Sequence, residues 1–381
     1  MAERKKIRVL HLASFAGNIG DLANHAGARR KFSQNIDLEF DITELEIREF
    51  YWKQRQFDSS FVDYANSFDL LIIGGGNYFE LWVENSATGT SIDIKPDEFA
   101  KLETPVMFYS LGADIGQGYS EHSATRFRSF IDTVLEREAA FVSVRNDGSK
   151  RALELILGAK ISAKIPVIAD GGFFCHEPTP KVGGATQSIG INIAGDMLDQ
   201  RFNEGTSVKD FISGLQQVCT TLIDQNPSLR IDLIPHIWRD VVFISEFIGE
   251  LPDPYLRRNV GIAPLLPTRE GLPEFLQRYA SYDLVLGMRF HANVCPIGMG
   301  VPTRGLYCYP QVKLLYEELG LEDRICDLKN GDFTTNLIET AQADLQAGNE
   351  IRARYTGVTE KLSAETDAVL QDVNTWLHSC L

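Results

Sequence analysis

The fold class of this chain is indicated by one short run of residues, Asp283-Leu284-Val285-Leu286-Gly287-Met288-Arg289-Phe290-His291-Ala292-Asn293. Its apolar part, residues 284–286, predicts a buried strand that a glycine ends. A helix is expected from about Ala292 to Gly298. Arg289 and His291 therefore fall between the carboxyl end of a strand and the amino end of a helix, where open α/β sheets bind their ligands.

Two interpretations of Arg289 and His291 follow from this position. The amino end of a helix offers backbone N–H donors and a partial positive charge, which favour an anion. Arg289 could grip a phosphate or carboxylate through two parallel hydrogen bonds, and His291 can pass a proton near neutral pH. Alternatively, Arg289 pairs with a structural carboxylate and His291 satisfies a buried carbonyl. These residues alone leave both interpretations open.

Length and composition describe a globular protein. The 381 residues are enough for two domains of ordinary size, and a content of 44% apolar and 23% charged residues is typical of soluble proteins. The formal charge of −15 argues against a general nucleic-acid binder, which would carry a basic face. An anionic substrate would therefore need a local cluster of arginines.

The cysteines and the start of the chain bear on its location. Six cysteines are scattered without a CxxC pair or a zinc spacing, and several fall in apolar segments, as reduced core cysteines do. The polar residues 1–8 predict no signal peptide, and no apolar run approaches the roughly 20 residues of a membrane-spanning helix. We expect a cytoplasmic protein with no metal site, no nucleic-acid partner and no transmembrane segment.

The first half of the chain predicts strands that alternate with helices. The expected strands are 7–12, 38–45, 69–73, 105–111, 140–144 and 166–169. Helices are expected over 22–32, 123–138 and 148–157, and residues 84–97 have the polar composition of a loop.

A glycine-containing run, Ala16-Gly17-Asn18-Ile19-Gly20-Asp21, separates the first strand from the first helix. Glycines at such a place let the backbone approach a ligand closely, so we expect Gly17, Asn18 and Asp21 to contact substrate. A structural role for Asp21, as the cap of the helix, is equally compatible with the sequence. The run lacks the third glycine and the lysine of dinucleotide and Walker-type sites.

A second run, Gly74-Gly75-Gly76-Asn77, follows the third strand. Three consecutive glycines after a buried strand indicate that a ligand or another backbone segment comes near. Gly75, Gly76 and Asn77 are therefore candidate substrate contacts, with tight packing of the turn as the competing account.

Two further charged side chains lie at expected strand ends. Arg145 repeats the position of Arg289, because it follows strand 140–144 and precedes helix 148–157. It is a candidate anion site, with an exposed salt bridge as the alternative. His236 follows the strand 229–234, where it either faces a ligand or serves as a turn residue.

The alternation restarts after residues 175–187, which are rich in proline, glycine and hydroxyl residues and are the best linker candidate. Strands are expected over 188–193, 229–234, 259–263, 284–286 and 301–307, and helices over 207–226, 242–250, 270–279 and 309–320. Irregular structure and then one long or two shorter helices, 349–381, are expected to complete the chain. This pattern predicts two Rossmann-like, doubly wound α/β domains facing a cleft.

The constellation of motifs resembles the polysaccharide pyruvyl transferase family. The matching runs are Gly17-Asn18-Ile19-Gly20-Asp21, Gly74-Gly75-Gly76, Ser143-Val144-Arg145, Pro235-His236, Gly287-Met288-Arg289-Phe290-His291-Ala292 and Gly298-Met299-Gly300-Val301-Pro302. The resemblance implies a fold like that of the B-type glycosyltransferases, with domains over 1–178 and 179–345. It places the donor motif in the second domain and returns the helices of 346–381 towards the first.

The resemblance also implies an activity: transfer of a pyruvyl group from phosphoenolpyruvate to two hydroxyls of a sugar, in cell-surface or exopolysaccharide synthesis. The family's arginine–any–histidine motif falls on Arg289 and His291. Arg289, with backbone N–H groups near Phe290, would hold the donor's phosphate, and His291 would act as acid and base. Arg145 would be a second anion clamp and His236 a further contributor. No cofactor is implied beyond the donor substrate.

The sequence leaves the acceptor open between lipid-linked, nucleotide-linked and polymeric sugars, and loop 84–97 is the candidate segment for acceptor choice. A lipid-linked acceptor would bring the protein to a membrane surface without a spanning segment. Two other functions fit the same fold: a nucleotide-sugar-dependent glycosyltransferase and a non-catalytic sugar- or nucleotide-binding protein.

Overall fold

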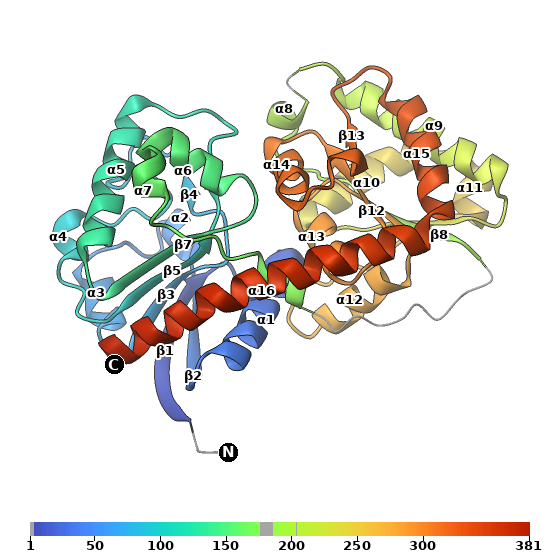
Figure 1. Cartoon of the computed structure of the whole chain (residues 1–381). Coiled ribbons are helices and arrows are strands. Elements are labelled where there is room, and N and C mark those ends of the chain that lie inside the picture. The colour runs from blue at the N-terminus through green and yellow to red at the C-terminus, as the bar shows by residue number, and fades with distance from the viewer. Residues whose placement is uncertain (1–3, 176–185, 203) are drawn as a thin grey trace. The chain divides into compact units, whose positions relative to one another are not determined.

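A computed structural model describes residues 4–175, 186–202 and 204–381 (Figure 1). By its internal contacts the chain divides into two compact units. Unit 1 holds Asn24–Gly171, Leu362–Leu381 and the described residues up to Phe15, and unit 2 holds Ala16–Ala23 and the described residues of Gly172–Lys361. The predicted boundary between 178 and 179, and most of the linker 175–187, lie outside the described residues.

Unit 1 is built on a five-stranded parallel sheet with the order β2-β1-β3-β5-β7. Its strands are β1 (Lys5–Ala13), β2 (Leu38–Glu46), β3 (Leu70–Gly74), β5 (Val106–Leu111) and β7 (Ala140–Val144). These confirm the first five predicted strands to within two residues at each end. The smaller elements of the unit are α2 (Arg48–Tyr51), α3 (Ser59–Ala65), α4 (Pro96–Phe99), α5 (Glu121–Glu136), α6 (Ser149–Leu157), α7 (Ala159–Ser162) and the short pair β4 (Phe79–Glu80) and β6 (Ala113–Asp114).

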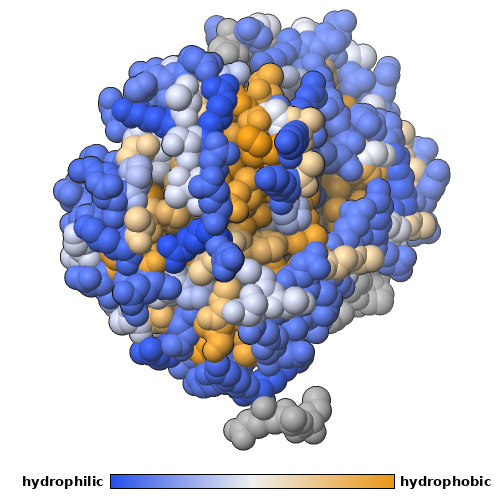
Figure 2. Space-filling model, turned by 60° about the vertical axis from the view of Figure 1, so that its left-hand side comes forward, coloured by the Kyte–Doolittle hydropathy of each residue, from blue (hydrophilic) through white to orange (hydrophobic). Residues whose placement is uncertain are grey.

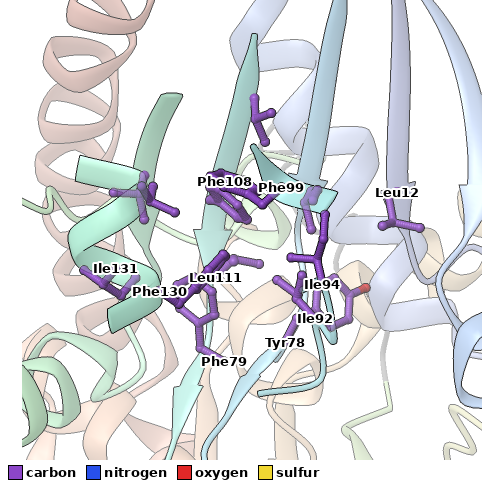
Figure 3. Close-up of a cluster of buried hydrophobic side chains, with 14 of the residues drawn as sticks. Leu12, Tyr78, Phe79, Ile92, Ile94, Phe99, Phe108, Leu111, Phe130 and Ile131 are labelled. Atoms are coloured by element: carbon purple, nitrogen blue, oxygen red, sulfur yellow. The ribbon is translucent and has the colours of Figure 1, made fainter. Parts of the chain in front are cut away.

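Side chains alternate between the two faces of this sheet, as the pleat requires. On one face Val9, Ile72 and Tyr109 pack with Phe32 of α1 (Ile19–Asn35) and Leu370 of α16 (Gly348–Cys380). The other face packs against α3, α4, α5 and α6. Its aromatic centre, drawn in Figure 3, joins the sheet to α4 and α5, with the ring of Phe130 5.6 Å from that of Phe99 and 5.7 Å from that of Phe108, both edge to face.

Unit 2 is built on a six-stranded parallel sheet with the order β10-β9-β8-β11-β12-β13. The strands are β8 (Ser188–Asn192), β9 (Arg230–Leu233), β10 (Val260–Ile262), β11 (Leu284–Gly287), β12 (Thr303–Tyr307) and β13 (Ile325–Asp327). The helices are α8 (Leu198–Arg201), α9 (Val208–Gln225), α10 (Trp238–Glu250), α11 (Asp253–Arg258), α12 (Leu272–Ser281), α13 (His291–Gly298), α14 (Pro310–Leu319) and α15 (Phe333–Gln346).

The core of unit 2 lies mainly between this sheet and the helices α9, α10 and α15. Phe211, Phe243 and Phe333 come from those three helices, and all are at most 3% exposed. The helix α13 is buried along its whole length, and apart from His291 and Asn293 its residues are apolar or small.

Four predictions about secondary structure were wrong, and one of them is the helix expected over 242–250, which begins one turn earlier at Trp238. Residues 166–169 form no strand, since only Val167 bridges to Val144, and Pro166 has no N–H to donate. The first helix begins at Ile19, one turn earlier than predicted, so that Asp21 lies inside its first turn and is not its cap. The irregular structure expected after Gly320 contains both β13 and α15, and α15 buries Phe333 and Leu337 one turn apart.

The last helix, α16, is one continuous helix of 33 residues. Tyr355 lies in unit 2, where its hydroxyl donates to the carbonyl of Thr303 at 2.8 Å. The part from Leu362 belongs to unit 1, where Asp367 accepts a hydrogen bond from Lys31 at 2.8 Å. The first part of the helix therefore packs in unit 2 and the last part in unit 1.

Candidate functional site

The candidate site of unit 2 lies where the strands β8, β9 and β11 end. The chain passes from β8 to β9 and β10 on one side and then returns to β11 on the other side of β8. The strand order therefore reverses between β8 and β11, and such a switch point is where doubly wound sheets bind ligands. Asn192, the last residue of β8, accepts from the backbone N–H of Arg289 at 2.9 Å and donates to the carbonyl of Ile234 at 2.8 Å. This side chain thus ties together the loops that follow the three strands.

Arg289 is held by two carboxylates. Its Nε and Nη2 donate to the two oxygens of Asp240 at 2.8 and 2.5 Å, and its Nη2 and Nη1 donate to the two oxygens of Asp196 at 3.0 and 3.3 Å. Burial alone would lower the pKa of Arg289, but the two carboxylates raise it. Of the two interpretations offered by the sequence, the pairing with structural carboxylates is the one the structure contains. Contact of Arg289 with a donor stays a prediction.

His291 is the first residue of α13 and faces the first turn of α1. Its Nδ1 lies 4.0 Å from Oδ1 of Asp21, and both side chains are largely buried. A Cβ added to Gly20 would lie 2.6 Å from both the Cβ and the Nδ1 of His291, so only glycine fits beside the imidazole. Phe290 packs its ring edge to face on His291, with 5.3 Å between the ring centroids.

The run around Gly17 shapes the start of α1. Gly17 has a φ of 77°, which favours glycine, and nothing lies within 4 Å of the position a side chain would take. Asn18 accepts a hydrogen bond from the backbone N–H of Gly20 at 3.1 Å, so Asn18 has the capping role that the sequence offered as one alternative for Asp21. Asp21 is thereby left pointing its carboxylate at His291.

His236 is a buried, neutral histidine. Its Nε2 lies 2.7 Å from the hydroxyl of Tyr279, and its backbone N–H donates to Asp240 at 2.9 Å. Burial lowers the pKa of His236 well below its usual value, and the nearby charges of Arg289 and His291 lower it further. The residue is therefore more than a turn residue, since its backbone N–H and the guanidinium of Arg289 donate to the same oxygen of Asp240.

The remaining candidates belong to unit 1. Arg145 is 3% exposed, and it donates to Asp147 at 2.9 and 2.7 Å and to Asp170 at 3.2 Å. The alternative of an exposed salt bridge was therefore wrong, because the pairing is buried. Its role as an anion clamp stays a prediction.

The glycine run of unit 1 is tightly packed. A Cβ on Gly75 would lie 2.8 Å from the ring of His25, and one on Gly76 would lie 2.4 Å from the ring of Tyr78. Packing of the turn therefore accounts for these glycines, and their contact with a ligand stays a prediction. Asn77 donates to Asp114 at 3.2 Å.

The loop 84–97, the candidate for acceptor choice, has no helix or strand before α4 and is organised by buried hydroxyls. The hydroxyl of Thr88 lies 2.9 Å from that of Thr90 and donates to the carbonyl of Ile92 at 2.7 Å. This confirms the predicted loop, and its role in acceptor choice stays a prediction.

Sequence reasoning missed the residues that organise the arginine. Asp196 and Asp240 come from the loop after β8 and from the start of α10, and a third side chain, Arg201, donates to Asp196 at 3.3 Å. Asp240 was visible in the sequence as the end of the run after β9. Its place three residues after Ile237 is the signal that could have found it, because an acidic residue at that position of a helix start accepts from the backbone N–H of the capping residue.

Across residues 4–175, 186–202 and 204–381, no group of three or more His, Cys, Asp or Glu side chains could hold a metal ion. Within the same ranges, no helix has both the length and the apolar character needed to cross a membrane.

The face drawn in Figure 2 is mostly hydrophilic, with hydrophobic residues gathered near its middle.

Comparison with known proteins gives one matching family and several solved structures with a similar fold. A family model described as polysaccharide pyruvyl transferase matches residues 18–308. No curated protein sequence matches the chain. Among solved structures it is similar to HepE of Anabaena in complex with UDP and glucose, with 14% identity, coverage of 96% of this chain and 99% of the other, and a TM-score of 0.53.

Two further structures have a similar fold. MnaA of S. aureus, in a co-structure with UDP, has 9% identity, covers 92% of this chain and 90% of its own, and has a TM-score of 0.53. A glycosyltransferase from Rickettsia africae has 10% identity, covers 97% and 98%, and has a TM-score of 0.52. At these identities the likeness concerns the fold alone. It confirms the predicted α/β fold with two Rossmann-like domains, similar to the B-type glycosyltransferases.

Proposed function

This chain belongs to the polysaccharide pyruvyl transferase family, and from that membership we propose that it moves the pyruvyl group of phosphoenolpyruvate onto two hydroxyls of a sugar. The methylene carbon of the donor takes up a proton, and the first sugar hydroxyl attacks the central carbon. The second hydroxyl then displaces phosphate. The two sugar hydroxyls release two protons in all. One of them replaces the proton taken up by the methylene carbon, and the other leaves on the phosphate. The products are a cyclic ketal and inorganic phosphate.

The observation that carries this proposal is the pairing of His291 with Asp21 at the switch point of the unit 2 sheet. An imidazole can give and collect protons near neutral pH, and a carboxylate on its Nδ1 side favours the tautomer that leaves Nε2 for the reaction. Such acid–base catalysis typically contributes about 10²–10⁴-fold to a rate. His291 is accordingly the proposed acid and base.

The donor has two anionic groups, a phosphate and a carboxylate. Arg289 and the amino end of α13 supply positive charge at the same place, which supports binding of one of these groups there. We propose the phosphate for this position. Arg145 is separately proposed as an anion-binding residue of unit 1, and loop 84–97 as the acceptor-selecting segment.

The acceptor is proposed to be a sugar of a growing polysaccharide, either lipid-linked, nucleotide-linked or polymeric.

A second function is favoured by a specific observation, because HepE and MnaA have a similar fold and were solved with UDP. A nucleotide-sugar-dependent glycosyltransferase would fit that likeness. The two functions differ in the donor they consume.

The test is a paired donor assay on the purified protein. Phosphoenolpyruvate or UDP-glucose is supplied with a panel of sugar acceptors, and phosphate release and the mass of the acceptor are measured. Phosphate release from phosphoenolpyruvate with gain of a pyruvyl group supports the proposal. Turnover of UDP-glucose without use of phosphoenolpyruvate would replace it by glycosyl transfer.

A further inference from the structure

The carboxylate of Asp196 lies between two arginines of unit 2. Arg289 donates to both of its oxygens, at 3.0 and 3.3 Å, and Arg201 donates to one of them at 3.3 Å. Arg201 also donates through Nε to the backbone carbonyl of Asp196 at 3.0 Å. The two guanidinium groups thus hold a carboxylate in the way that arginines bind the anionic groups of substrates.

The two carboxylates that contact Arg289 differ in their surroundings. The side chain of Asp240 is 0% exposed and also accepts from the backbone N–H groups of Gly195 at 3.0 Å and His236 at 2.9 Å. The side chain of Asp196 is 19% exposed. Asp240 is therefore the permanent partner of Arg289, whereas Asp196 is the partner that solvent or a ligand can reach.

The backbone next to Asp196 is also unusual. Met197 has a φ of 54°, a left-handed conformation that is unfavourable for a residue with a side chain. The strain is confined to the residue directly after the carboxylate, and the turn could relax if the carboxylate swung away. Strained backbone of this kind is common at sites that change conformation.

We propose that Arg201 and Arg289 form an anion subsite, that the Asp196 carboxylate occupies it as a built-in stand-in, and that the phosphate or carboxylate of an anionic substrate takes its place. This inference rests on the proposed function for the identity of the substrate, but its test does not need turnover. It assigns Arg201, which lies outside the arginine–histidine motif, to the binding of the donor.

Charge balance explains why the exchange is feasible. Arg201 and Arg289 carry two positive charges, and Asp196 and Asp240 cancel them. When Asp196 turns towards solvent, one positive charge remains for the incoming anion, next to the amino end of α13. Burial alone would raise the pKa of Asp196, but Arg289 and Arg201 keep it below its usual value, so the competing carboxylate is charged at neutral pH.

Occupation by Asp196 lowers the observed affinity for an anion, because only the fraction of molecules with a displaced Asp196 can bind. Asp196→Asn keeps the shape and removes the competing charge, so it should bind inorganic phosphate and phosphoenolpyruvate about tenfold more tightly. Arg201→Met should bind both more weakly, again by about tenfold, because the subsite loses one cation. The two variants are thus expected to change affinity in opposite directions.

The experiment is calorimetric titration of the whole protein and its variants with inorganic phosphate, pyruvate and phosphoenolpyruvate. Asp323→Asn is the matched control, since it removes a carboxylate from an exposed pair with Arg354 in the same unit. It reports how much the loss of one negative charge raises anion affinity by itself. Tighter binding of phosphate or pyruvate by Asp196→Asn than by this control supports the subsite and distinguishes which group it takes.

Equal or weaker anion binding by Asp196→Asn overturns the inference, and so does unchanged binding by Arg201→Met. The inference is also overturned if Asp196→Asn binds neither phosphate nor pyruvate when these ligands are present at millimolar concentration. If Asp196→Asn does not fold, Arg201→Met decides alone. The proposed function is tested separately by the donor assay. It fails if the unmodified protein transfers no pyruvyl group from phosphoenolpyruvate to a sugar.

Discussion

Asp21 and His291 face each other from the first turns of two helices, with 4.0 Å between Oδ1 of one and Nδ1 of the other. The carboxylate therefore lies on the Nδ1 side of the imidazole. Gly20 fixes the ring from the same side, because a Cβ there would lie 2.6 Å from Nδ1. Two neighbouring residues of α1 therefore determine where the imidazole lies and which of its nitrogens faces away.

Gly20→Ala should displace the imidazole of His291. The new methyl group meets the ring at a distance that atoms do not tolerate, so the ring must move, and a displacement of about 1 Å can cost about 10²-fold in rate. We expect kcat to fall by at least about tenfold with little change in KM. Gly249→Ala, at an exposed helical glycine with nothing within 4 Å, should keep kcat. Equal kcat in the two variants would show that Gly20 does not position the ring.

Asp21→Asn should lower kcat by about tenfold while leaving the affinity for phosphoenolpyruvate unchanged. The amide keeps the size of the side chain but removes the charge that favours one tautomer of His291. Asp21→Glu should recover part of the rate, because it restores the charge. Steady-state kinetics on the three proteins would check this, and a wild-type kcat in Asp21→Asn would remove the residue from the mechanism.

His291→Ala should lower kcat by about 10²–10⁴-fold, the usual contribution of a positioned acid and base. The variant should still fold but unfold at a lower temperature, because the side chain is largely buried and its removal leaves a cavity. His122→Ala is the matched control, because His122 is an exposed histidine in the first turn of α5. Loss of activity in both variants would point to a general effect of histidine removal.

Most strands of the sheets could be predicted because they are apolar runs that a glycine or a polar turn ends, as β3 and β11 are. Strand β11 and the helix after it follow directly from residues 283–293. Helix α15 was missed because Thr334, Thr335 and Asn336, poor helix formers, occupy its first turn. Its stability comes from burying Phe333 and Leu337 in the unit 2 core, and a tertiary contact of this kind leaves no local signal.

The position of the candidate site could be predicted from the sequence, but the carboxylates that pair with Arg289 could not. Strand ends and glycine runs located Arg289 and His291 at an edge where ligands bind. The carboxylates that hold Arg289 lie 49 and 93 residues away in sequence, and any of the acidic residues could have been chosen. The pairing follows from the strand order, which brings the loops after β8 and β9 beside β11.

Arg289→Ala should destabilise unit 2 as well as weaken donor binding. The side chain of Asp240 is 0% exposed, and without the guanidinium it becomes a buried, unpaired charge, which typically costs about 3–5 kcal/mol. Urea denaturation would measure the loss. Arg278→Ala, which removes one partner of an exposed pair with Glu274, should cost less than about 1 kcal/mol. Similar losses in both variants would contradict the structural role of Arg289.

The stability of the protein should depend on pH through Glu80. Burial, helped by the charge of Asp114, raises the pKa of this carboxyl from 4.5 to about 7, although the hydrogen bond that Ser91 donates to it lowers the pKa. Between pH 4.5 and 7 the unfolded chain has lost this proton while the folded protein keeps it, so the stability falls as pH rises through that window. The loss is complete above about pH 7 and absent below the pKa of the unfolded chain.

Glu80→Gln removes this cost, because the amide is neutral at every pH and can still accept from Ser91. The variant should be more stable than the unmodified protein at pH 8, by about 1–3 kcal/mol, and should have no such advantage at pH 4. Thermal unfolding at both pH values would measure the difference. Glu121→Gln, in which the changed side chain is 75% exposed, shows what the loss of a surface charge does by itself. An equal gain for Glu80→Gln at pH 4 and pH 8 would mean that packing, and not the buried charge, accounts for the change.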